Sequence, residues 1–538
     1  MTITPTTDRR RFASVRWPTI VVVAALLLAA CGTSDGGSNA QAPTGGDDQG
    51  QTGSGEPVYG GVLRVAHTSV PTSLDPHLAT SGFDHYVLYP LYDRLVHFKP
   101  ETLEATPGLA REWSYPDPQT FVLELQEGVE FHDGTPFNAE AVKINLERVM
   151  NHPDSAATAD VTTIDSVEVV DDLTVQVNLN RPDTALPLIL SDKAGMMVSP
   201  TAIEEYGDDL GNNPVGTGPF SFVSYVPGES LVLERFDGYW QEGLPYLDGM
   251  EFQIYTDSRT AVNALVSGQQ DFATSIDAPD FDRVEQANGV ELVVSQTLAF
   301  NRCTMRFDLE PFNSLEVRQA MNYGIDRDAL NYVINRGLGE PAHAPLPTTH
   351  WAYPTDVVPV YEYDPERARE LLADAGYPDG ITIDTVVVTS ERDRSMVEAM
   401  QSQLGAAGIT LDVTVLDFAE ASPAFRERDE FDMFCVGWSG RPDPYQTYAA
   451  LYSSQSSYVN PYDEPEGLQE ALDATVAVED QEARAEAFAE LSQLVIVDNA
   501  LDLHVAMRPG VQAHADRVKG YVPNLYGKPI MNEVWLAE

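Results

Sequence analysis

The segment DPERARELLADAGYP (residues 364–378) carries the clearest helix signal in the chain. Asp364 can cap the first turn, Pro365 stands at the first helical position, and Gly376 with Pro378 ends the apolar periodicity. Weaker signals of the same kind cover residues 138–150, 258–268 and 326–337. The segment DQEARAEAFAELSQLV (480–495) predicts a long amphipathic helix.

Short strands are predicted between these helices. Residues 167–170 and 173–179 alternate with period two on either side of Asp171-Asp172, which predicts a hairpin. Residues 231–235, 385–388 and 411–416 predict further strands, and the apolar run FDMFCV (431–436) predicts a buried one. Helices alternating with strands over so long a chain predict an α/β protein with several lobes rather than one core.

The N-terminus has the features of an export signal. Basic residues 9–11 and 16 precede an apolar stretch at 20–30, so residues 1–30 are predicted to be a signal peptide. The apolar stretch is too short to span a bilayer as a helix. The sequence LAAC (28–31) resembles the bacterial lipobox, which implies a lipid on Cys31; the alternative is an ordinary signal peptide with a chance cysteine. The Sec and twin-arginine export routes both stay open. Residues 31–56 are rich in Gly, Ser, Thr, Gln and Asp and predict a flexible tether.

Composition and motifs limit the classes of partner and of activity that the chain can have. The formal net charge of −51 disfavours nucleic acid and anionic lipid headgroups as partners. Arg441 occupies the last glycine position of a nucleophile elbow, and no HExxH, CxxC or phosphate-binding loop occurs. We therefore predict a monomeric binding protein with no catalytic residues, no cofactor and no metal site. Cys303 and Cys435 could form a disulfide or remain two buried thiols.

A series of sequence blocks runs in one order from about residue 57 to the end of the chain. The blocks are GGVLR (60–64), SLDP (73–76), PGLA (107–110), EGVEFHDGTPFNAEAV (127–142), NPVGTGPF (213–220), VRQAM (317–321) and LLADAG (371–376). This series resembles the bacterial extracellular solute-binding protein family 5, the peptide- and nickel-binding receptors of ABC importers.

The resemblance implies a type II periplasmic-binding-protein fold of the cluster C type. Two major lobes are expected, with an extra domain inserted in the first lobe. Residues 57–100, 206–300 and 506–538 would form lobe I, residues 101–205 the inserted domain, and residues 301–505 lobe II. Chain crossings near 298–302 and 503–508 would form the hinge. The implied function is a lipid-anchored extracytoplasmic receptor that captures an oligopeptide-like solute by hinge closure and delivers it to a permease.

The segment GWSGRPDPYQTY (437–448) is the predicted ligand loop. Trp438 offers an apolar face. Peptide receptors of the family place an ammonium-binding carboxylate before the Asp-Pro step, but here Arg441 stands nearest that position. Arg441 could pair an anionic ligand group, or it could pair only with Asp443. The predicted ligand contacts are Trp438, Ser439, Arg441, Asp443, Tyr445, Asn301 and Arg302.

Two arginines near one cleft favour an anionic ligand end. A receptor for another anionic solute or for a nickel-type metal chelate is the first alternative function. An exported hydrolase is the second.

Overall fold

The computed structural model describes residues 55–456, 458–460 and 462–538. The predicted signal peptide, the lipidation site at Cys31 and nearly all of the predicted tether lie outside these residues. Within them, no helix is both long enough and apolar enough to cross a membrane.

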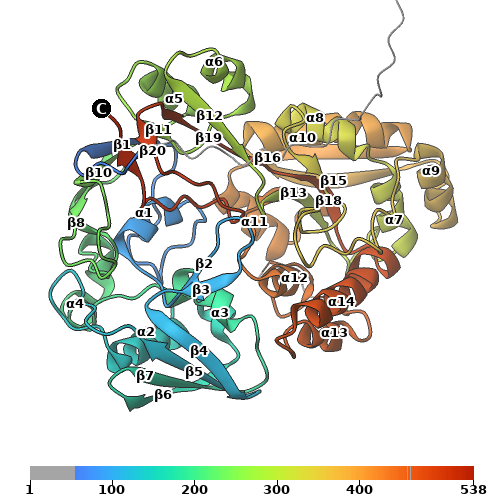
Figure 1. The fold of residues 1–538 in the computed structure, drawn as a ribbon. Helices are drawn as coiled ribbons and strands as arrows, with labels where there is room; N and C mark the ends of the chain where they lie inside the picture. Colours follow the sequence, from blue (N-terminus) through green and yellow to red (C-terminus); the bar gives the residue numbers. More distant parts are fainter. Residues whose placement is uncertain (1–54, 457, 461) are drawn as a thin grey trace, which may run out of the picture. The chain divides into compact units, whose positions relative to one another are not determined.

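Strands from three separate parts of the sequence form a seven-stranded sheet, visible as neighbouring blue, green and red arrows (Figure 1). Strand β1 runs parallel to its neighbours β10 and β11, and the remaining pairs are antiparallel. In spatial order the strands are β12 (Val290–Ser295), β19 (Gly510–Ala515), β11 (Phe272–Ala273), β1 (Val62–His67), β10 (Gly249–Ile254), β9 (Ser230–Arg235) and β8 (Phe220–Val226).

A six-stranded sheet is the second large sheet. Strand β15 is parallel to β16 and β17, whereas β13 is antiparallel to β17 and β18. All residues of β13 and β18 are buried, because both strands lie inside the sheet. In spatial order the strands are β14 (Glu340–Pro341), β18 (Leu503–Met507), β13 (Phe300–Met305), β17 (Met433–Trp438), β15 (Ile381–Val388) and β16 (Ile409–Leu416).

A four-stranded antiparallel sheet contains the predicted hairpin, which is confirmed as β6 and β7. Its strands, in spatial order, are β4 (Ala110–Asp117), β5 (Thr120–Leu125), β7 (Thr174–Leu179) and β6 (Ile164–Asp171). Two small sheets pair β2 (Val96–Phe98) with β3 (Ala105–Pro107) and β20 (Val518–Lys519) with β21 (Trp535–Leu536). The predicted strands at 231–235, 385–388, 411–416 and 431–436 are confirmed as parts of β9, β15, β16 and β17.

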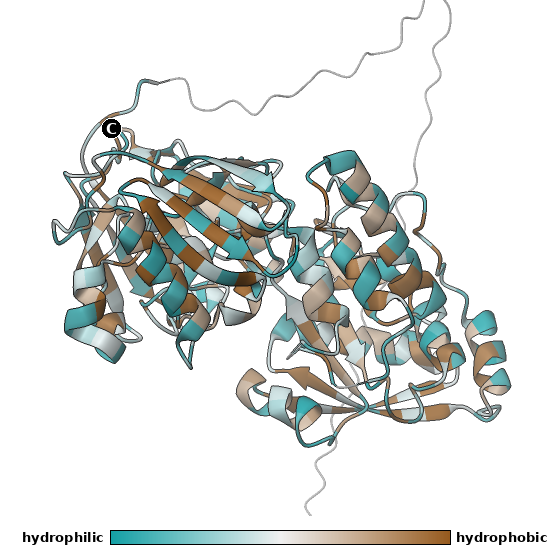
Figure 2. Ribbon diagram, turned by 90° about the horizontal axis from the view of Figure 1, so that it is seen from below, coloured by the Kyte–Doolittle hydropathy of each residue, from teal (hydrophilic) through white to brown (hydrophobic). Residues whose placement is uncertain are grey.

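The predicted helices are confirmed with small shifts at their ends. Asp364 caps α9, since its Oδ1 accepts hydrogen bonds from the backbone N–H groups of Glu366 and Arg367. The helices are α1 (His85–Leu91), α2 (Ala139–Asn151), α3 (Leu186–Ile189), α4 (Pro200–Tyr206), α5 (Ser258–Val266), α6 (Phe281–Glu285), α7 (Leu315–Tyr323), α8 (Arg327–Asn335), α9 (Pro365–Asp374), α10 (Glu391–Ala406), α11 (Phe418–Arg426), α12 (Pro444–Tyr452), α13 (Leu468–Ala474) and α14 (Gln481–Ser492). Hydrophobic residues run along the strands, and the helices carry hydrophilic residues over much of their surface (Figure 2).

The chain passes between the two large sheets in two short segments. Residues 296–299 link β12 to β13, and residues 508–509 link β18 to β19. The two crossings are bonded to each other, because Thr297 Oγ1 donates to the carbonyl of Arg508 (2.7 Å) and the backbone N–H of Arg508 donates to the carbonyl of Ala299 (2.7 Å). The bounds of lobe I, the inserted domain and lobe II stay a prediction.

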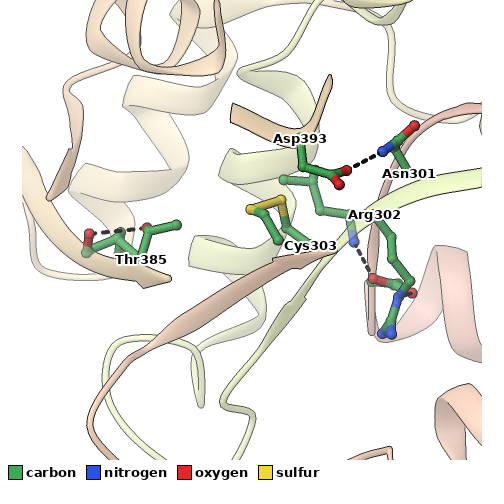
Figure 3. Close-up of a disulfide and its surroundings, with 9 residues drawn as sticks. Asn301, Arg302, Cys303, Thr385 and Asp393 are labelled. Carbon is green, nitrogen blue, oxygen red and sulfur yellow. Dashed lines mark hydrogen bonds and ion pairs between the residues drawn. A yellow bond between two sulfur atoms is a disulfide. The ribbon is translucent and has the colours of Figure 1, made fainter. Parts of the chain in front are cut away.

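A disulfide joins Cys303 of β13 to Cys435 of β17, which settles the alternative left open by the sequence (Figure 3). The two cysteines face each other in the antiparallel register of the strands, and both are fully buried. The bond therefore fixes the strand that follows the first crossing to the strand that precedes the predicted ligand loop.

Candidate ligand-binding site

The loop after β17 is held close to both crossings by two glycines. A Cβ at Gly437 would lie 2.2 Å from Arg508 Nη1 in the second crossing. Gly440 has a positive φ of 74°, and a Cβ there would lie 2.4 Å from Leu298 Cβ in the first crossing. Only glycine fits at position 440, where the near atoms are the Cβ and backbone of Leu298, whereas Gly437 lies against the end of the Arg508 side chain. The loop thus packs directly on the segments that join the two large sheets.

Trp438 is buried at the end of β17, with 7% of its surface exposed. Its ring meets Tyr458 edge to face, with centroids 5.2 Å apart, and the guanidinium carbon of Arg441 lies 5.1 Å from the indole centroid. The indole Nε1 is buried, and no acceptor for it exists among the residues that the structure describes. Trp438 thus presents an unused hydrogen-bond donor beside a cation.

Arg441 is partly buried, and its Nη1 donates to the carbonyl of Gly440 (3.0 Å). In the described part of the chain, no carboxylate lies within ion-pair distance of its guanidinium. Burial lowers the pKa of Arg441, but the charges of Asp160 and other neighbouring acidic groups raise the pKa by more than burial lowers it, so the net shift is upward. Arg441 therefore stays charged, and most of its donors have no partner among the described residues.

Lys528 is a third polar group without a partner, and sequence reasoning missed it. It is 8% exposed, and its ammonium has neither a hydrogen-bond acceptor nor a carboxylate within ion-pair distance in residues 55–456, 458–460 and 462–538. Burial, together with the charges of Lys193, Arg441 and Arg508, lowers the pKa of Lys528 to about 7. Lysine is rare in the sequence, and this scarcity was the only available hint.

The neighbouring charged groups are already bonded within the protein. Asp160 accepts a hydrogen bond from Gln446 Nε2 (2.9 Å), and Asp192 accepts one from Tyr526 (2.7 Å) as well as contacting His85. Lys193 donates to two backbone carbonyls, those of Ala79 and Ser81. The donors of Trp438, Arg441 and Lys528 differ from these groups, because they lack such partners among the described residues.

Two predicted loop contacts are bonded to other residues of the protein. Asp443 is fully buried, caps α12 through the N–H of Tyr445 (2.9 Å), and accepts from Arg484 Nη2 at 2.9 and 3.0 Å. The alternative in which Arg441 pairs with Asp443 is therefore wrong. Tyr445 OH accepts from Arg181 Nη2 (2.6 Å), so this hydroxyl is also occupied within the protein.

The two predicted contacts on β13 differ from each other. Arg302 is 2% exposed and pairs with Asp502 (2.6 Å), so the prediction of a second ligand-facing arginine is not supported (Figure 3). Successive side chains on a strand point to opposite faces, which separates Arg302 from its neighbour Asn301. Asn301 lies opposite Gly437 in the sheet and donates to Asp393 (2.5 Å), and its Oδ1 has no donor among the described residues.

A cavity of about 620 Å³ lies away from this loop and contains none of the predicted contacts. Its lining includes Phe307, Arg318 and Tyr462, and the Nε and Nη1 donors of Arg318 are bound to the carbonyls of Asn499 and Phe312. No group of three His, Cys, Asp or Glu side chains in the described residues could hold a metal ion.

Two mixed sheets joined by paired crossings are the arrangement expected of a two-lobed binding protein. The family model of bacterial extracellular solute-binding proteins, family 5 (middle region), matches residues 104–459. The chain belongs to this family, which confirms the predicted fold and family; the cluster C assignment stays a prediction. Members of the family are extracytoplasmic transport receptors and not enzymes, so the non-enzymatic prediction is confirmed.

Individual relatives agree with this membership. The chain is 34% identical over 384 residues to the glutathione-binding protein GsiB of Pectobacterium atrosepticum, covering 70% of this chain and 74% of the relative. It is similar to the ABC transporter-associated periplasmic binding protein DppA from Helicobacter pylori in complex with the peptide STSA, with a TM-score of 0.79, 26% identity, and 89% and 99% of the two chains covered.

A more distant structure shows the fold alone. The oligopeptide-binding protein AppA from Bacillus subtilis, in complex with a nonapeptide, has a TM-score of 0.77 at 22% identity and covers 90% of this chain and 100% of its own.

Proposed function

We propose that the chain is a lipid-anchored, monomeric receptor of an ABC importer that captures a short anionic peptide of the glutathione class. The observation that carries this proposal is the pair of unused donors at Trp438 Nε1 and the Arg441 guanidinium. The named function of the 34% identical relative, glutathione binding, and the peptide in the Helicobacter pylori structure support the ligand class.

A ligand carboxylate would supply what these donors lack. A buried donor without an acceptor, such as Trp438 Nε1, is unfavourable by about 1–3 kcal/mol, and a guanidinium such as that of Arg441 can bind a carboxylate through two parallel hydrogen bonds. The loop contacts both crossings through Gly437 and Gly440, so a ligand held there would favour one relative orientation of the two large sheets. Binding coupled to hinge closure follows from this arrangement.

The anchor would keep the receptor on the outer face of the membrane. Cys31 at the end of the LAAC sequence is the proposed lipidation site, and residues 32–56 would form the tether. The acidic surface would keep the receptor soluble and away from anionic headgroups, so the lipid would be its membrane contact and the permease its protein partner.

Native mass spectrometry of protein purified without denaturation should detect the co-purified solute, and calorimetric titration should then measure its binding. We expect a glutathione-like mass and saturable binding of glutathione, with compaction in small-angle scattering and a higher melting temperature. Arg367→Ala is the matched control for variants of Arg441, because Arg367 is an arginine that pairs with Glu370 on the surface of α9. A stoichiometric metal in elemental analysis would instead favour the chelate receptor, and cleaved peptide products would favour a hydrolase.

A further inference from the structure

Lys528 is held rigidly in a buried turn. Asn524 fixes it from both sides, since Asn524 Oδ1 accepts from the backbone N–H of Lys528 (3.2 Å) and Asn524 Nδ2 donates to its carbonyl (2.7 Å). The preceding Gly527 has a positive φ of 73° and contacts Thr297 in the first crossing. The backbone of Lys528 therefore has a defined position near the hinge segments.

The ammonium of Lys528 and the hydroxyl of Ser439 both lie beside Gly82. A Cβ built on Gly82 would lie 3.0 Å from Lys528 Nζ and 3.2 Å from Ser439 Oγ. Neither group has a hydrogen-bond partner among the described residues. Two donors from distant parts of the sequence therefore lie against the same glycine.

The ammonium of Lys528 ends a largely buried side chain, and no carboxylate of the described residues lies within ion-pair distance of it. The chain provides aromatic faces, with Nζ 5.5 Å from the Tyr526 centroid and 5.9 Å from the Phe83 centroid. These faces do not accept conventional hydrogen bonds, and a lysine ammonium has three donors. The cations Lys193, Arg441 and Arg508 lie near enough to disfavour its charge, whereas Asp192, which favours it, is bonded to Tyr526 and His85.

We propose that Lys528 and Ser439 form a second anion subsite, next to the Trp438–Arg441 donors, so that the receptor selects peptide-like solutes with two anionic groups. The inference rests on the proposed function, and it adds the requirement for a second anion. A solute with one carboxylate would leave Lys528 or Arg441 buried without an acceptor, and such unmatched polar groups are a strong source of discrimination. Lys528 follows β20 in the sequence and Ser439 follows β17, so an anion bound by both would join segments that extend from different sheets.

The test is a calorimetric cycle with three probes. Glutathione carries two carboxylates; its glycine monoethyl ester and a derivative amidated at the γ-glutamyl α-carboxyl each carry one. Lys528→Met should weaken glutathione binding by at least about tenfold, and Lys528→Arg should weaken it less. One of the two single-carboxylate probes should bind wild type and Lys528→Met with affinities within about twofold, because that probe lacks the group that Lys528 holds.

Controls separate this inference from folding effects and from the proposed function. Lys99→Met removes an exposed lysine and should change nothing. Ser439→Ala should lower glutathione affinity several-fold with an unchanged melting temperature, which keeps the test valid if Lys528→Met folds poorly. Equal affinities of wild type and Lys528→Met for glutathione, or the same loss for all three probes, would overturn the second subsite. Failure of the wild type to bind glutathione at all would overturn the proposed function, and the inference with it.

Discussion

Arg484 holds the carboxylate of Asp443 at the start of α12, with Nη2 2.9 Å from one oxygen and 3.0 Å from the other. The pair is almost completely buried, and Arg484 Nε also donates to the carbonyl of Thr475 (2.7 Å). This ion pair fixes the C-terminal end of the ligand loop to α14. The position of the loop is thus set by the protein itself, and Arg441 is left for another partner.

Arg484→Met should therefore act on stability. Removing one partner of a buried ion pair strands the other charge, and the free energy of unfolding should fall by about 3–5 kcal/mol. Urea denaturation of wild type and variant measures the loss, with the surface variant Arg367→Ala as control. An unchanged unfolding midpoint would contradict the structural role of the pair.

Arg441→Ala should act on affinity. If its guanidinium binds a ligand carboxylate in buried surroundings, truncation should weaken glutathione binding by about 2–5 kcal/mol, or about 30-fold to several thousand-fold. Arg441→Lys should restore part of the affinity, because an ammonium lacks the paired donors of a guanidinium. Calorimetric titration decides the matter, and affinities within a few-fold of wild type would leave Trp438 as the main contact.

Loss of the disulfide should lower the stability of the protein more than it lowers the affinity for the ligand. The bond spans 132 residues, and a loop of that length corresponds to about 5 kcal/mol of chain entropy in the unfolded state. The double variant Cys303→Ala/Cys435→Ala should unfold at lower guanidinium concentration, while the ladder between β13 and β17 keeps the ligand loop in place. Wild type treated with reductant is the control, because it loses the same bond without a substitution. A large loss of ligand affinity with an unchanged unfolding midpoint would contradict this prediction.

The stability should fall as the pH drops below about 6.5. Burial lowers the pKa of His67 and His77 to about 4 and that of His350 to about 3, whereas the unfolded value is about 6.5. Between these values the unfolded chain binds more protons, so acid favours unfolding, by up to about 1.4 kcal/mol per pH unit for each histidine. The stabilising contribution is complete above pH 6.5 and is lost as the pH falls towards the folded values.

Urea denaturation between about pH 5 and 7 measures this slope, above the range in which exposed carboxylates titrate. His350→Gln removes one of the three groups and should make the slope shallower, even if the variant is less stable at neutral pH. A slope identical to that of the wild type would show that His350 does not contribute.

Cys31→Ser should abolish membrane association. The serine variant has no thiol for a thioether-linked lipid, so the protein should appear in the soluble extracytoplasmic fraction after cell fractionation. Ser34→Ala changes the predicted tether but leaves the LAAC sequence intact, so this matched control should partition with membranes as the wild type does. Continued membrane partitioning of the Cys31→Ser variant would refute the lipobox interpretation.

Local sequence signals were sufficient for some of the helices and strands of this chain, whereas others, such as α10 and β1, were not predicted from them. The cap at Asp364 and the alternation around Asp171-Asp172 act over a few residues, so propensity and turn chemistry determine them. The ordered family blocks then implied the fold. The pairing of Cys303 with Cys435 depended on the register of strands far apart in sequence, which local patterns do not contain.

The candidate site was predicted only in part for the same reason. Trp438 and Arg441 lie in one short loop, where their residue types already indicated recognition. The roles of Arg302 and Asp443 were decided by Asp502 and Arg484, which are distant in sequence and satisfy the charges internally. Lys528 becomes conspicuous only when the structure brings it next to Ser439 and Gly82.

The disulfide also affects what happens to the protein after cleavage by proteases, to which an extracytoplasmic protein is exposed. Cys303 and Cys435 close a covalent ring, and the loop with Trp438 begins directly after it. A single backbone cut between the two cysteines would open the ring without separating the molecule into two pieces. The nicked chain would remain one covalent molecule from its N-terminal end to the residues that follow β17.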